Sequence, residues 1–213
     1  MYRISVTSYR SLFCLLLLVL VSTAAFAADT LTNLQALYTA QTATQIQLTA
    51  YAVQADTEGY KTAAALFRAA AKSKGIHLPA YEKAIKALGG QTTQPDAKPP
   101  VVKTTKENLE TAMKAETEVA AQYAEYMKQA DADKKAGTLK GDATKAGIFL
   151  GGDSKAGVEL LKLYKKGLDN LDAWKSGGKE FLVCTVCSYI TDDTTVKQCP
   201  VCSAPREKFE SFK

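Results

Sequence analysis

The sequence Cys184-Thr185-Val186-Cys187, followed after eleven residues by Cys199-Pro200-Val201-Cys202, decides the fold of the C-terminal part of the chain. Each C-x-x-C turn directs two sulfur atoms to one point, and two such turns complete a tetrahedron of thiolates around one metal ion. Zinc, as a structural ion, and iron, as a one-electron redox centre, both suit this ligand set. Two disulfides are a further interpretation. The spacing therefore predicts a metal site at Cys184, Cys187, Cys199 and Cys202 and leaves the metal open.

The first 27 residues have the pattern of a secretory signal peptide. Two arginines precede an apolar run from Leu12 to Val21, and Ala25-Phe26-Ala27 is a typical cleavage site. The apolar run is too short to serve as a stable membrane anchor. We therefore expect cleavage near Ala27 and a periplasmic or otherwise exported protein. Since cleavage removes Cys14, the mature chain would keep only the four motif cysteines.

The net positive charge of the chain is small and dispersed. There are 27 lysine and arginine residues against 22 aspartate and glutamate residues. The lysines lie along the predicted helices and do not form one basic run. Nucleic-acid binding therefore has no support in the sequence.

Residues 28–175 are predicted to form four helices, because apolar residues recur there at helical spacing. The helices are expected at residues 31–56, 60–88, 106–133 and 154–174. A proline-rich linker over residues 91–104 separates the second from the third. Pro79 is expected to kink the second helix near His77, and the glycines of residues 134–152 predict an irregular segment. Two hairpins joined by a long crossover predict a mainly α fold, a ferritin-like four-helix bundle, followed by a small cysteine module at residues 179–213.

The third helix repeats the first. With an offset of 75 residues, nine of the 24 positions from Asn33 to Asp56 carry the same amino acid as their counterparts. We interpret this as an internal duplication, with shared helical composition as the alternative. The offset makes Gln41 the counterpart of Glu116.

From Leu31 onward the sequence resembles the rubrerythrins. The resembling features are Asn33-Leu34, Glu58-Gly59-Tyr60, Ile76-His77 with Tyr81, Asn108-Leu109, and the cysteine module with Phe181, Tyr189, Pro205 and Phe209. The resemblance implies a rubredoxin-like module with one iron ion bound by four cysteines, and electron transfer. It departs at Ser188 and at Ser203-Ala204, where the family's module usually has glycine, which tolerates a positive φ and lets backbone N–H groups approach the sulfurs.

In that family the bundle core holds two irons, bound by glutamates of the first and third helices and by acid-x-x-His motifs of the second and fourth. The positions where this chain departs from those ligands are Gln41, Arg68, Lys74, Val119, Gly157 and Leu160. Glu116 is kept, and His77 is the only histidine of the chain. Because cations at ligand positions repel iron, we expect no di-iron centre.

Four residues, Gln41, Lys74, His77 and Glu116, form a possible vestigial site in the bundle. Gln41 and Glu116 are interpreted either as a weak metal site or as a hydrogen-bonded polar pair, and His77 either as a residual ligand or as a hydrogen-bonded core histidine. A buried Glu116 needs a cation or donors. We therefore expect Lys74, or failing it Arg68, to pair with Glu116, and Gln41 and His77 to complete the hydrogen bonds, although both cations could instead face solvent.

The resulting expectation is an exported electron-transfer protein with a mononuclear Fe(Cys)4 centre and a bundle that has lost its di-iron site. The bundle would serve as a scaffold or as a docking surface for a redox partner protein, and the resemblance allows a homodimer. Two alternatives are a rubrerythrin-like peroxidase with an altered metal site and a zinc-stapled binding module without a redox role.

Overall fold

The computed structural model describes residues 7–96, 98–175 and 177–213, with side chains from Thr30 onward. The helices are α1 (Thr7–Thr57), α2 (Lys61–Gly75), α3 (Leu78–Ala87), α4 (Thr105–Lys135) and α5 (Ala146–Asp169), with short 3-10 helices η1 (Gly141–Lys145), η2 (Leu171–Trp174) and η3 (Arg206–Lys208). The strands are β1 (Phe181–Cys184), β2 (Ile190–Thr191) and β3 (Phe209–Phe212). A mainly helical chain that ends in a small sheet confirms the predicted fold class.

The expected signal peptide of residues 1–27 stays a prediction. Residues 1–6 lie outside the described residues, and so do the side chains of the part of α1 that precedes Thr30. In the part of the chain that the structure describes, no helix is both long and apolar enough to cross a membrane.

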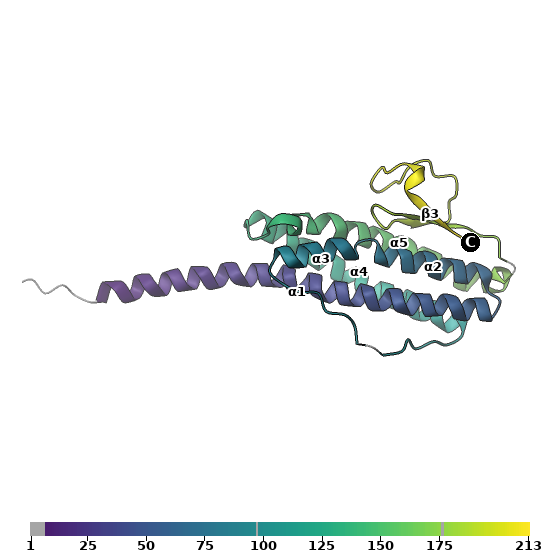
Figure 1. Cartoon of the computed structure of the whole chain (residues 1–213), viewed down its shortest axis with the longest axis horizontal. Coiled ribbons are helices and arrows are strands. Elements are labelled where there is room, and N and C mark those ends of the chain that lie inside the picture. Colours follow the sequence, from purple (N-terminus) through teal and green to yellow (C-terminus); the bar gives the residue numbers. More distant parts are fainter. Residues whose placement is uncertain (1–6, 97, 176) are drawn as a thin grey trace, which may run out of the picture.

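Four helical rods form the bundle, and α2 and α3 together make the second of them (Figure 1). The helical backbone is interrupted between Gly75 and Leu78, and Pro79 stands in the first turn of α3, where its missing N–H costs nothing. This confirms the predicted kink near His77. The linker after α3 lies along α1, since Gln35 Nε2 donates to the Gln91 carbonyl over 2.7 Å.

The prediction of an irregular segment over residues 134–152 was wrong for its last seven residues, because α5 already begins at Ala146. The glycines that lower helix propensity here allow close packing instead. A Cβ atom on Gly151 would be in contact with Met127 Sδ, and one on Gly152 would lie 2.8 Å from His77 Cε1. Tertiary packing therefore overrides the local propensity.

The contacts of the bundle repeat with the same offset of 75 residues as the sequence. Glu58 Oε2 accepts a hydrogen bond from the Thr105 backbone N–H over 2.8 Å at the start of α4. Its counterpart Asp133 accepts a hydrogen bond from the hydroxyl of Thr30, which is the counterpart of Thr105. Corresponding residues therefore join the two halves of the bundle at both places, through a backbone N–H in one and a hydroxyl in the other, which supports the internal duplication.

The small C-terminal sheet is antiparallel, in the order β2-β1-β3, and it packs on the bundle beside α2 and α5 (Figure 1). Phe181, Val183 and Ile190 are fully buried in the same apolar cluster as Phe67 of α2. Leu182 belongs instead to a cluster with the cysteines. The central strand β1 thus has the bundle core on one side and the cysteine site on the other.

Candidate metal centre

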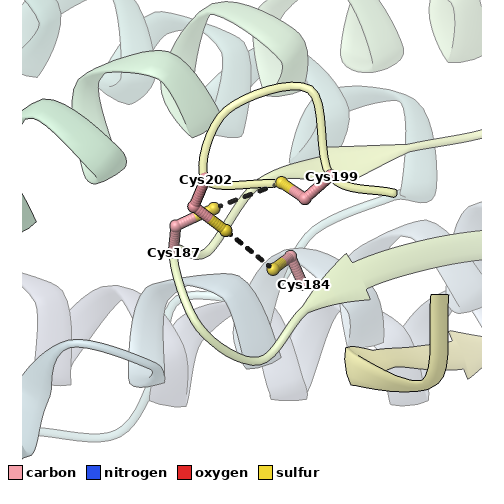
Figure 2. A group of neighbouring side chains, drawn as sticks. All are labelled: Cys184, Cys187, Cys199 and Cys202. Carbon is pink, nitrogen blue, oxygen red and sulfur yellow. Dashed lines mark hydrogen bonds between the residues drawn. The ribbon is translucent and has the colours of Figure 1, made fainter. Parts of the chain in front are cut away.

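The four cysteines converge on one point, as Figure 2 shows. All four sulfur atoms lie within 4.8 Å of one another, with Cys184 Sγ 3.7 Å from Cys202 Sγ and Cys187 Sγ 3.5 Å from Cys199 Sγ. A tetrahedral ion with metal–sulfur bonds of about 2.3 Å requires sulfur separations of about 3.8 Å. Disulfide sulfurs lie only about 2.05 Å apart. The geometry fits a thiolate-bound iron or zinc ion and does not support the two-disulfide interpretation.

The turns after both cysteine pairs keep a backbone that normally calls for glycine. Ser188 has a φ of 64° and Ser203 a φ of 59°. With this backbone, N–H groups donate to the sulfurs: those of Val186 and Cys187 to Cys184, that of Tyr189 to Cys187, and that of Ala204 to Cys202. Both turns therefore have the backbone geometry expected of a glycine-containing cysteine turn, although serine stands at the position of positive φ.

The metal-free thiols differ in their ionisation. Burial raises the pKa of the Cys184 thiol and raises the pKa of the Cys187 thiol far more. Without a metal ion both thiols therefore keep their protons at neutral pH, and a bound metal ion would take the place of these protons. Burial also acts on the Cys202 thiol, but hydrogen bonds, chiefly from the Ala204 N–H, outweigh it and lower its pKa. Three of the four cysteines are buried, and Cys202 is exposed.

A buried polar network joins the cysteine module to the bundle. Ser188 Oγ donates to Asp153 Oδ1 of α5 over 3.0 Å, and Ser73 Oγ of α2 donates to the Ser188 carbonyl over 2.7 Å. Asp153 also accepts from the Tyr81 hydroxyl over 2.7 Å, and its Oδ1 lies 2.7 Å from His77 Nδ1. Three polar side chains, Ser188, His77 and Tyr81, therefore meet at the Asp153 carboxylate, and Ser73 holds the same turn through the Ser188 carbonyl.

Sequence reasoning missed Asp153, although it is the centre of this network. It directly follows Gly151-Gly152, between the segment predicted to be irregular and the predicted fourth helix, so no helical pattern indicated that its side chain is buried. A Cβ atom on Gly152 would lie 3.0 Å from the Cys187 carbonyl oxygen. Glycine at this position therefore allows α5 to approach the cysteine turn.

Replacement by glycine should change the stability of the module in opposite directions at Ser203 and Ser188. Ser203 is exposed, and Ser203→Gly is expected to raise the free energy of unfolding of the metal-loaded module by about 1 kcal/mol, because glycine removes the strain of the left-handed backbone. Ser188→Gly removes the same strain but also the hydrogen bond to Asp153, which is worth about 1.5 to 3 kcal/mol. We expect it to lower stability. Thermal unfolding followed by visible absorption measures the stability of both variants. An equal increase in stability for the two would contradict a structural role of the Ser188 hydroxyl.

In the bundle core, Lys74 and Glu116 form a buried ion pair. Lys74 Nζ lies 2.8 Å from Glu116 Oε1 and 2.6 Å from Oε2, and the two residues are only 5% and 4% exposed. Gly157 of α5 makes room for this pair, since a Cβ atom there would lie 2.5 Å from Glu116 Oε1. The expected pairing of Lys74 with Glu116 is present in the structure.

The other expected hydrogen bonds of this pair are not formed. Gln41 Nε2 donates to the Tyr123 hydroxyl, and His77 is held by Asp153 toward the cysteine module. Arg68, the second candidate partner, pairs with Asp56 at the surface. The structure thus brings Lys74 and Glu116 together, places Gln41 beside them, and separates His77 from them as a hydrogen-bonded core histidine.

Comparisons with known proteins agree with this architecture. Residues 31–140, slightly more than half of the chain, match the family described as "Ferritin-like domain", and residues 183–210 match "Rubrerythrin, rubredoxin-like domain". No curated protein sequence matches the chain.

Solved structures of nigerythrin have a similar fold. The fully reduced, all-ferrous state is 23% identical over 85% of this chain and 86% of nigerythrin, with a TM-score of 0.72. The mixed-valence and partially reduced states are each 22% identical over the same shares, with TM-scores of 0.72 and 0.71. At this level of identity the likeness concerns the fold alone.

Proposed function

Because this chain belongs to the rubrerythrin family of ferritin-like proteins, we propose that it is an exported electron-transfer protein with one iron ion bound by Cys184, Cys187, Cys199 and Cys202. The observation that carries this proposal is the convergence of four cysteine sulfurs within 4.8 Å. When bound, iron in such a site supplies one reversible electron.

The surroundings of the cysteines suit a redox centre. The backbone N–H groups that donate to the sulfurs stabilise the more negative, reduced form of a thiolate site. Burial of Cys184, Cys187 and Cys199 excludes water, whereas Cys202 is exposed, and Val186 in the first cysteine turn is 50% exposed. A redox partner protein would therefore exchange electrons at the Cys202 edge.

We also propose that the bundle holds no di-iron centre. Glu116 is engaged by Lys74, and His77 is held by Asp153 away from that pair, so the two residues do not face one metal position. Among the residues whose side chains the structure describes, the cysteines form the only cluster of at least three His, Cys, Asp or Glu residues close enough to hold a metal ion. The ammonium group of Lys74 supplies positive charge at a position where the family has an iron ligand.

Metal analysis of the protein purified from its native compartment tests the proposal. We expect about one iron per chain and a visible absorption that bleaches reversibly on reduction. Hydroperoxide reduction should be negligible, since four thiolates leave an iron ion no open position for peroxide. Three irons per chain with peroxide turnover would favour the peroxidase, and one zinc would favour the zinc-stapled module. Recovery of the full-length chain in the cytoplasm would contradict export.

A further inference from the structure

A pocket lies between α1 and α4, above the buried Lys74–Glu116 pair. Its volume is about 410 Å³, within the usual range of small-molecule sites. Its mouth is formed by small exposed side chains, including Ala40, Ala43 and Ala115, which leave the space between the two helices open. Its floor is buried and mainly apolar, so the pocket can take up a molecule that water solvates poorly.

Buried polar groups with unused hydrogen-bonding capacity line this pocket. Tyr164 is 1% exposed, and its hydroxyl has no hydrogen-bond partner among the described residues. Gln41 uses its Nε2 atom for Tyr123, which leaves its carbonyl oxygen as a free acceptor within the same part of the chain. Both polar atoms are therefore available to form hydrogen bonds with a molecule that enters the pocket.

The charges of the pocket select the kind of partner. Lys74 and Glu116 neutralise each other at the floor, so a charged ligand would find no counter-charge of its own and would lose its hydration. A hydroxyl group on an uncharged ring could accept a hydrogen bond from the Tyr164 hydroxyl and donate one to the Gln41 carbonyl oxygen, while the ring fills the apolar volume. We propose that this pocket binds a small uncharged cyclic molecule that carries a hydroxyl group. The inference does not depend on the metal at the cysteines.

Equilibrium dialysis of the full-length, metal-loaded protein against three probes tests the inference. The probes are 2-naphthol, naphthalene and 2-naphthoate, which share a ring system and differ only in the polar group. We expect one saturable site that binds 2-naphthol about tenfold more tightly than naphthalene, the effect of one good hydrogen bond. The charged 2-naphthoate should bind more weakly than both.

Two kinds of variant locate the site. Tyr164→Phe should weaken the binding of 2-naphthol, which would keep only its hydrogen bond to Gln41, and leave naphthalene binding unchanged. Tyr38→Phe is the matched control, because Tyr38 is a buried tyrosine outside this pocket, and it should change neither affinity. Ala112→Leu fills the floor and Ala43→Trp covers the exposed mouth, so each should abolish binding of both neutral probes.

The visible spectrum of the cysteine site serves as a control for folding in every variant. If Ala112→Leu fails to fold, the exposed Ala43→Trp still decides the question. Absence of saturable 2-naphthol binding, equal affinity for 2-naphthol and 2-naphthoate, or binding that Tyr164→Phe does not weaken would each overturn the inference. A homodimer that covers the mouth and excludes the probes would also overturn it.

Discussion

Replacing Cys187 by serine is expected to release the metal ion and unfold the module of residues 179–213. Cys187 is buried and its sulfur lies 3.5 Å from that of Cys199, so a serine hydroxyl there removes one corner of the tetrahedron. A segment of about 35 residues has too little apolar surface to fold unaided, so metal binding and folding should be one event. Loss of the visible absorption would show that the metal is released, and new proteolytic cleavage within residues 185–205 would show that the module is unfolded.

The same loss is expected for serine at each of the other three cysteine positions. Thr185→Ser is the matched control, because Thr185 is exposed in the same turn and its hydroxyl donates to the Lys208 carbonyl over 2.9 Å, a bond that serine can keep. This variant should retain metal and protease resistance. A Cys187→Ser protein that stays resistant in the presence of a chelator would show that packing of β1 on the bundle is sufficient to hold the module.

Replacing Lys74 by methionine is expected to lower the free energy of unfolding of the bundle by about 3 to 5 kcal/mol. Methionine has a similar length but no charge, so it leaves the Glu116 carboxylate buried at 4% exposure without a counter-charge. A further Glu116→Gln substitution should recover part of the loss, because it removes the unpaired charge. Chemical denaturation measures both effects.

Arg68→Met is the matched control for this prediction. Arg68 lies on the same helix, and its pair with Asp56 is exposed, so its loss should cost no more than about 1 kcal/mol. A Lys74→Met protein as stable as wild type, or as little affected as Arg68→Met, would mean that the buried pair does not stabilise the fold.

The four cysteine ligands could be predicted from sequence, because the two C-x-x-C spacings determine where the sulfurs point. The pairing of Lys74 with Glu116 could also be predicted, because a buried carboxylate in the helical core requires a cation and few cations are within reach. In each case a local rule and a strong energetic requirement led to the same residues.

The partners of Gln41 and His77 could not be predicted, because Gln41 is bound by Tyr123 of α4 and His77 by Asp153 of α5, and both contacts depend on how these helices pack. Asp153, which holds His77, lies in a glycine-rich stretch whose helical structure depends on contacts with α4 and with the cysteine module. Because glycine has no side chain, the spacing of apolar residues does not reveal whether a glycine position is buried. The same absence of a side chain hid the room that Gly157 makes for the buried pair.

The position of Gly157 against Glu116 restricts which substitutions the bundle core can accept. A larger side chain at residue 157 would collide with Glu116 as long as Lys74 holds it in place, because even a Cβ atom there would lie 2.5 Å from Glu116 Oε1. Loss of Lys74 first would instead leave Glu116 unpaired and the bundle destabilised. The three positions therefore constrain one another, and a change at one of them is tolerated only together with a change at another.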